Sequence, residues 1–146
     1  MSRSIGLCCV ALAALTSGLR ADEKADEWKG LKGTWKVEKA VLRGQDTTDA
    51  FKSAVLTMSD DGKYVVDFGG MQDKGTIAVD PAKKPKRMTI TGTEGPNQGK
   101  ALPAVYELTG DTLKICYQLE GKDPPAGLES KAGTSTLFIE YKRDKK

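Results

Sequence analysis

Six acidic side chains in segments that read as loops are the residues best suited to acid–base chemistry or to calcium binding. They are Asp46, Asp49, Asp73, Glu94, Asp123 and Glu129. Carboxylates that converge from loops can bind calcium or act together as a general acid and base. However, no stretch has the regular spacing of an EF-hand loop, and lysines are interspersed among the acids. We therefore interpret these carboxylates as solvated loop charge, and predict neither a metal site nor a catalytic pair.

The lack of histidine in the 146-residue sequence narrows the chemistry further. It excludes Ser-His-Asp and Cys-His catalysis, histidine-ligated haem and histidine-based zinc sites. Carboxylates, lysines and tyrosines remain as the groups that could transfer protons. We expect no catalytic residues, no enzyme activity and no cofactor.

Four aromatic side chains at alternating positions are candidates for binding a small molecule. Tyr64, Phe68, Tyr106 and Tyr117 would face the interior of a closed sheet, where tyrosine hydroxyls could orient a ligand. The alternative is that they simply fill the interior, because an eight-stranded barrel is barely wider than its own side chains. The sequence leaves both interpretations open.

Period-2 alternation of apolar and polar residues, interrupted by glycine- and aspartate-rich turns, predicts eight strands. The clearest case is the seventh, in which Leu113 and Ile115 alternate with Lys114 and Cys116. The predicted strands are 34–42, 54–59, 63–68, 75–80, 86–92, 101–108, 112–119 and 136–143. A short helix that places Trp28 and Leu31 on one face precedes them.

The connections between these strands alternate between long and short. In an up-and-down barrel, successive connections lie at opposite ends, so the long loops 43–53, 69–74, 93–100 and 120–135 would form a mouth. The short turns and the helix would form a closed base. We predict an all-β, eight-stranded antiparallel up-and-down barrel with a short N-terminal helix.

Two other β architectures share features with this pattern. A two-sheet sandwich could show similar strands, but hairpins between near neighbours throughout favour the barrel. Fatty-acid-binding proteins have ten strands and a helix-turn-helix after the first. The segment 43–53 has room for one helical turn at most, which disfavours that fold.

Residues 1–21 have the features of a secretory signal peptide. Arg3 supplies the positive charge, the apolar stretch 5–15 is too short to span a bilayer, and Ala21 suits the cleavage site. A lipoprotein anchor on Cys8 or Cys9 is the alternative. We predict an exported protein, periplasmic or extracellular, with one domain over residues 22–146 and no transmembrane segment.

The domain that would remain after cleavage is nearly neutral. It would have 125 residues, 21 of them basic and 20 acidic, a net charge of +1. This balance provides no electrostatic footprint for nucleic acid or anionic lipid. Cys116 would be its one cysteine, so no intramolecular disulfide could form, and we interpret it as a buried thiol that packs as a small apolar side chain.

The opening of the first predicted strand, Gly33-Thr34-Trp35, resembles the Gly-x-Trp signature of lipocalins. In that family the tryptophan lies across the closed base, and an arginine at the end of the last strand packs on it. Arg143 continues the inward face of the last predicted strand. Barrel closure would place it beside Trp35, where a cation–π contact is available. The alternative is that Arg143 belongs to a solvated tail.

A wider resemblance covers nearly the whole of 22–146. The segments 31–37, 93–97 and 106–116 together resemble a lipocalin-like domain family of planctomycete exported proteins. This resemblance implies a barrel fold and export. It implies no activity, because none is established for the family.

Three classes of function remain open from the sequence. The first is a carrier that binds a small apolar molecule in the barrel or at its mouth. The second is a non-catalytic module whose loops 43–53, 69–74, 93–100 and 120–135 contact another exported protein or an envelope polymer. The third, an enzyme using mouth carboxylates, is disfavoured by the missing histidine and the lack of a paired-acid motif.

Overall fold

The structure is a computed structural model that describes residues 21–145. The predicted signal peptide, residues 1–21, lies outside the described residues except for Ala21. Within the described part of the chain, no helix is both long and apolar enough to cross a bilayer.

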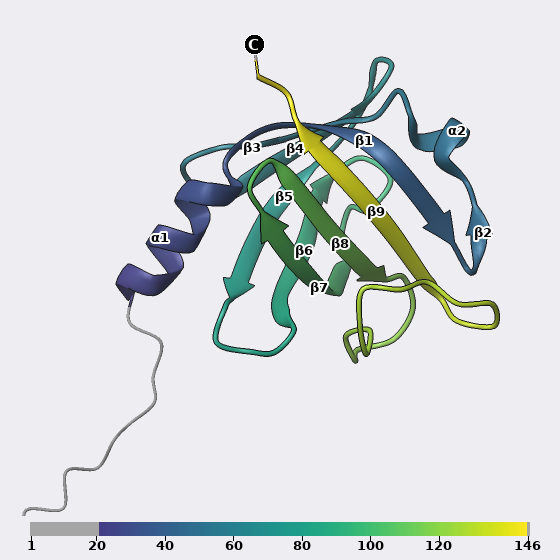
Figure 1. Cartoon of the computed structure of the whole chain (residues 1–146). Coiled ribbons are helices and arrows are strands. Elements are labelled where there is room, and N and C mark those ends of the chain that lie inside the picture. The colour runs from purple at the N-terminus through teal and green to yellow at the C-terminus, as the bar shows by residue number, and fades with distance from the viewer. Residues whose placement is uncertain (1–20, 146) are drawn as a thin grey trace, which may run out of the picture.

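Residues 21–145 form two short helices and nine strands (Figure 1). The helices are α1 (Ala21–Leu31) and α2 (Thr48–Phe51). The strands are β1 (Gly33–Leu42), β2 (Gln45–Asp46), β3 (Val55–Met58), β4 (Lys63–Phe68), β5 (Met71–Asp80), β6 (Lys86–Glu94), β7 (Ala101–Thr109), β8 (Thr112–Gln118) and β9 (Thr136–Arg143).

The eight longer strands close into an antiparallel barrel, which confirms the predicted fold class. They pair in the order β1-β3-β4-β5-β6-β7-β8-β9, and β9 pairs back with β1. The closing pair places Trp35 opposite Arg143 at one end and Leu42 opposite Leu137 at the other. The two-residue strand β2 only extends β1 into a small hairpin. The two helices lie at opposite ends of the barrel (Figure 1).

The prediction of one of the four mouth loops is wrong. The segment 69–74 was expected to be a loop, but β5 begins at Met71, and only Gly69 and Gly70 turn the chain. Their φ angles of 69° and 110° lie in the left-handed region, which glycine adopts at little cost. Asp73 is therefore a strand residue and not a loop residue.

The segment 43–53 contains one helical turn, which is the most that its length was expected to allow. That turn is α2, which follows the small β1–β2 hairpin. The carboxylate of Asp46 accepts a hydrogen bond from the backbone nitrogen of Thr48 at 2.9 Å, which satisfies a donor at the start of the turn. This contact fixes α2 beside the mouth end of β1.

The segment 120–135 was expected to belong to the mouth, but part of it folds onto the outer surface of the barrel. Ser130 is buried, and its hydroxyl donates to the carbonyl of Thr136 at 2.9 Å. Beneath the segment lies Cys116, which is buried on the outward side of β8, with its sulfur 3.7 Å from the carbonyl of Glu129. The prediction of a buried thiol is confirmed. Burial raises its pKa to about 11.

The base of the barrel is closed by Trp35 and the end of α1. Trp35 and Leu31 are fully buried, and the Trp35 indole donates to the Leu31 carbonyl at 2.8 Å. The guanidinium of Arg143 lies 4.3 Å from the centroid of the Trp35 ring. The same guanidinium donates to the carbonyls of Gly30 and Lys32 at 2.5 and 3.0 Å. It thereby satisfies carbonyls at the C-terminus of α1 that have no partner within the helix.

Further side chains hold α1 across the base. Glu27 accepts hydrogen bonds from the Tyr106 hydroxyl at 3.0 Å and from the Lys86 ammonium at 2.9 Å. Trp28 donates through its indole nitrogen to the carbonyl of Ser59 at 2.7 Å. An isolated helix of this length is marginal in water, so these contacts with the barrel account for its position.

Replacing Trp35 with alanine should lower the free energy of unfolding by about 3–5 kcal/mol, because it removes a fully buried ring and leaves a cavity beneath Arg143. Urea unfolding measures this change in the free energy of unfolding. Met71→Ala is the control, since Met71 is 57% exposed and should change stability by less than about 0.5 kcal/mol. A loss below about 1 kcal/mol for Trp35→Ala would contradict a closing role for the ring.

Candidate functional site

The mouth half of the barrel interior contains a cavity of about 220 Å³. The base half is filled by large buried side chains, including Trp35, Met58, Met88 and Leu113. Toward the mouth, side chains such as Leu56, Phe68 and Tyr117 line the space without filling it. The interior is therefore packed near the base and open toward the mouth.

Three of the four aromatic residues predicted to bind a ligand line this cavity. They are Tyr64, Phe68 and Tyr117. The fourth, Tyr106, is not among the lining residues, because it lies at the base with its hydroxyl on Glu27. The sequence left open whether these aromatic residues fill the interior or line a space. Tyr106 fills the interior, and the other three line a space.

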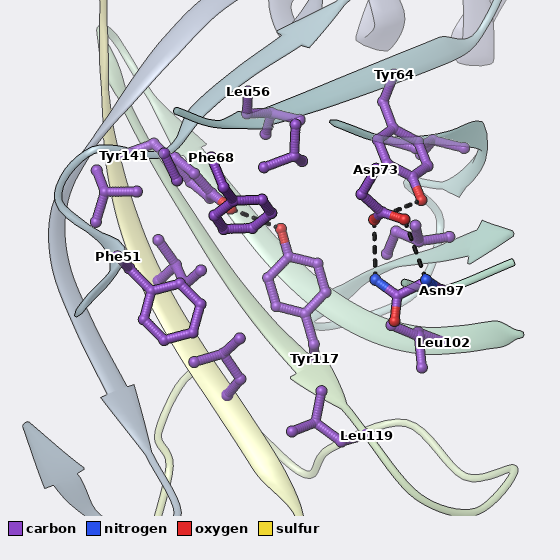
Figure 2. Close-up of a pocket in the computed structure, with 17 residues that line it drawn as sticks. Phe51, Leu56, Tyr64, Phe68, Asp73, Asn97, Leu102, Tyr117, Leu119 and Tyr141 are labelled. Atoms are coloured by element: carbon purple, nitrogen blue, oxygen red, sulfur yellow. Dashed lines mark hydrogen bonds between the residues drawn. The ribbon is translucent and has the colours of Figure 1, made fainter. Parts of the chain in front are cut away.

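Asp73 is the charged residue of the cavity wall, and only 4% of it is exposed. One carboxylate oxygen accepts from the Tyr64 hydroxyl at 3.2 Å and from the Asn97 side-chain amide at 2.9 Å. The other accepts from the Asn97 backbone nitrogen at 3.2 Å. Figure 2 shows these three side chains converging on one side of the cavity. Such donors stabilise a carboxylate that would otherwise be costly to bury.

Strand register explains why Asp73 faces inward. In β5 the buried positions are Asp73, Gly75, Ile77 and Val79, which is strict alternation. Tyr64 of β4 lies directly opposite Gly75, so Asp73 is its diagonal neighbour. The sequence contained this signal, because extending the alternation of Ile77 and Val79 backward by two steps reaches Asp73.

Gly75 makes room for the Tyr64 ring. A Cβ atom at Gly75 would lie 2.8 Å from a ring carbon of Tyr64 and 1.9 Å from the carbonyl oxygen of Thr91. The missing side chain allows the ring to cross the strand, which brings its hydroxyl within reach of Asp73. The glycine is therefore a requirement of the site as well as of the fold.

Asn97 reaches Asp73 from the loop between β6 and β7. Gly95 has a φ of 91°, and a Cβ there would lie 2.4 Å from the carbonyl oxygen of Gln72. A Cβ at Gly92 would lie 2.0 Å from the carbonyl oxygen of Asn97. The loop can pack this closely on β5 and β6 only because both positions are glycine. No pattern in the sequence marks Asn97, since only the folded loop brings it to the cavity.

A second polar group of the cavity is a pair of tyrosines. The hydroxyls of Tyr117 and Tyr141 are 2.9 Å apart, and both residues line the cavity. Burial raises the pKa of Tyr117 and that of Tyr141 well above the usual range. Burial and the neighbouring charge of Asp73 raise the pKa of Tyr64 in the same direction. These phenols therefore remain neutral hydrogen-bonding groups at physiological pH.

Two phenylalanines line the mouth side of the cavity. Phe51 is the last residue of α2 and Phe68 the last of β4, and their rings meet edge to face with centroids 6.4 Å apart. The Thr48 hydroxyl, 3.1 Å from the backbone nitrogen of Ala40, helps to hold α2 in this position. No pattern in the sequence marks Phe51, because it falls in a segment expected to be a loop.

The six acidic side chains considered first do not converge. Asp46, Asp49, Glu94, Asp123 and Glu129 are exposed, and Asp73 alone of the six is buried. For Asp73 the interpretation as solvated loop charge is wrong, because the residue belongs to a strand and faces inward. In the part of the chain that the structure describes, no group of three or more Asp, Glu or Cys side chains is placed to hold a metal ion.

The fold and this cavity define an eight-stranded antiparallel β-barrel with a mostly apolar interior space that contains one carboxylate. No protein-family model matches the chain, and no curated protein matches it. Among solved structures, it is similar to a DUF4847 family protein from Bacteroides vulgatus ATCC 8482. The two share 14% sequence identity and a TM-score of 0.49, over 79% of this chain and 94% of that chain. None of these comparisons assigns the chain to a lipocalin family, so that resemblance stays a prediction.

The four tyrosines should not titrate while the protein is folded. Burial raises the pKa of Tyr64, Tyr106, Tyr117 and Tyr141 above the usual value of 10.0. Their contribution to stability is therefore complete below about pH 10 and falls above it, because the unfolded chain then releases protons that the native state retains. Tyrosinate absorbance should appear only as circular dichroism reports unfolding.

The same titration in strong denaturant is the control, and there all four should ionise near pH 10. Tyrosinate absorbance near pH 10 in a protein that remains folded would contradict the burial of these hydroxyls.

Proposed function

We propose that this protein is an exported, lipocalin-like binding protein that holds a small, largely apolar molecule in the mouth half of its barrel and catalyses no reaction. The observation that carries the proposal is the cavity of about 220 Å³, whose walls are mainly aliphatic and aromatic. A preformed apolar space with a few converging polar groups is the usual form of a small-molecule site.

The volume of the cavity limits the size of the occupant. An apolar protein cavity of about 150 Å³ accommodates benzene, so this one suits a molecule of about ten non-hydrogen atoms. Pockets for drug-sized ligands are larger, roughly 300–1,000 Å³. We therefore propose a compact ligand and not a long acyl chain.

The closed base supports a lipocalin-like carrier. Arg143 packs on Trp35, which is the arrangement that the Gly33-Thr34-Trp35 resemblance implies. With this end occupied by Trp35 and Leu31, a ligand would enter from the mouth. The proposal of export rests on the features of residues 1–21 in the sequence.

Binding without catalysis is supported by the hydrogen bonds of the one carboxylate in the cavity wall. Asp73 already accepts three hydrogen bonds. A second carboxylate, which paired-acid hydrolysis requires, is not among the residues that line the cavity. The proposed role of Asp73 is to orient a ligand.

Native mass spectrometry on the mature protein, purified without detergent from a host that exports it, tests the proposal. A reproducible added mass that is released on denaturation is the expected result. A protein with no added mass that also fails to bind small aromatic compounds would overturn the proposal. The long loops would then become the candidate surface for a protein or polymer partner.

Ala54→Phe should abolish occupancy of the cavity, because the new ring fills space that the alanine leaves open. We expect affinity for a small aromatic compound to fall by at least about tenfold, equivalent to about 1.4 kcal/mol. The matched control is Ala78→Phe, which adds the same ring at an exposed position of β5 outside the cavity. Circular dichroism verifies that both variants fold. Equal affinity in the two variants would show that binding occurs elsewhere.

A further inference from the structure

The cavity wall has a negative charge without a positive partner. Asp73 is one of its lining residues, and the lining contains no lysine or arginine. The ion pairs formed within residues 21–145 do not include Asp73 either. Its partners are the neutral groups of Tyr64 and Asn97. A buried carboxylate is ordinarily paired with a cation, so this one has an unused capacity for charge pairing.

We propose that the cavity selects a small primary amine, whose ammonium group lies beside Asp73 while its hydrocarbon or aromatic body occupies the apolar remainder. This inference rests on the proposed binding function and specifies the chemical class of the ligand. An alkylamine of this kind is protonated at neutral pH, as the lysine side chain is.

The geometry of the Asp73 carboxylate leaves room for a further donor. An ionised carboxylate has about four acceptor positions. Three are used by Tyr64 and Asn97. The three existing donors come from β4 and from the loop between β6 and β7, which lie on one side of the cavity (Figure 2). An ammonium group could therefore approach from the cavity and occupy the remaining position.

The energetics favour a cation over a neutral ligand of the same shape. The cost of removing a charge from water often cancels the gain from a buried ion pair. Here the carboxylate is already desolvated in the folded protein, so only the ammonium loses hydration on binding. The charge of Asp73 acts across a largely apolar space, where electrostatic interactions are stronger than in water. The same field repels an anionic ligand, which provides selectivity.

The remaining walls suit a compact hydrocarbon body. Leu56, Phe68, Leu102 and the Tyr117 ring line the same space as the carboxylate (Figure 2). An aromatic ring can pack against these side chains while a short alkyl chain extends to Asp73. Aromatic faces close to the carboxylate also attract an ammonium group.

The competing explanation is that Asp73 only anchors the loop that contains Asn97. In that case the charge would contribute to folding and would have no effect on which molecules bind. The two explanations predict different orders of affinity for ligands that have the same body and different head groups.

Isothermal titration calorimetry with phenethylamine, 2-phenylethanol and phenylacetate separates these explanations, because the three probes have nearly the same size. We expect phenethylamine to bind at least about tenfold more tightly than 2-phenylethanol, and phenylacetate to bind most weakly. This order is measured on the unaltered protein, so it needs no variant to fold. If 2-phenylethanol binds as tightly as phenethylamine, the amine proposal is overturned and a neutral binding site remains.

Asp73→Asn assigns the preference to the carboxylate. The affinity for phenethylamine should fall by at least about tenfold, and the affinity for 2-phenylethanol should stay within about threefold of that of the unaltered protein. Asp123→Asn is the control, since it removes the same charge from an exposed loop position outside the cavity and should leave both affinities unchanged. An amine preference that survives Asp73→Asn would overturn the role of Asp73.

Failure of the proposed function has a different outcome. If none of the three probes binds and the purified protein carries no added mass, both the binding function and the amine selectivity are overturned. If the probes do not bind but a released compound that lacks an amine is found, only the amine selectivity is overturned.

Discussion

The guanidinium of Arg143, at the end of β9, connects that strand to α1 and β1, which lie near the other end of the described chain. Arg143 is the last residue of β9. Its guanidinium covers the Trp35 ring at the start of β1 and donates hydrogen bonds to carbonyls at the end of α1. The closed barrel depends on this arrangement, because β9 must return to β1 with Arg143 in register with Trp35. Once the base is fixed in this way, the mouth is the end at which loops and α2 can vary around a rigid scaffold.

The two halves of the barrel interior differ in how completely they are filled. Large residues such as Met58, Met88 and Tyr106 fill the half near α1, whereas the half near α2 is left partly empty. An eight-stranded barrel has little interior volume to spare, so a cavity of about 220 Å³ is a large part of that interior. Gly75 also shapes this interior, because its missing side chain leaves room for the Tyr64 ring and thereby brings the Tyr64 hydroxyl to Asp73.

The strand pattern, the closure and the buried Cys116 could all be predicted from the sequence, because period-2 alternation and hairpin length are local signals. Three of the four proposed aromatic residues line the cavity for the same reason. Asp73 was misinterpreted because acidic residues usually mark loops, and Gly69-Gly70 was not recognised as a complete turn. Whether Tyr106 lies at the base or beside the cavity depends on its height along the barrel axis. Asn97 reaches the cavity only through the folded conformation of its loop. Neither property is encoded in the local period.

The pairing of β1 with β9 also constrains the order in which the chain can fold. The two strands that complete the barrel lie near opposite ends of the described chain, so about a hundred residues separate the partners in the closing register. The hairpins between neighbouring strands can form as the chain emerges, but the barrel cannot close until the last strand is available. Until then β1 lacks its β9 neighbour, and its exposed backbone donors and acceptors are open to pairing with other chains. The interval between the emergence of β1 and the arrival of β9 is therefore the stage at which this protein is most exposed to misassembly.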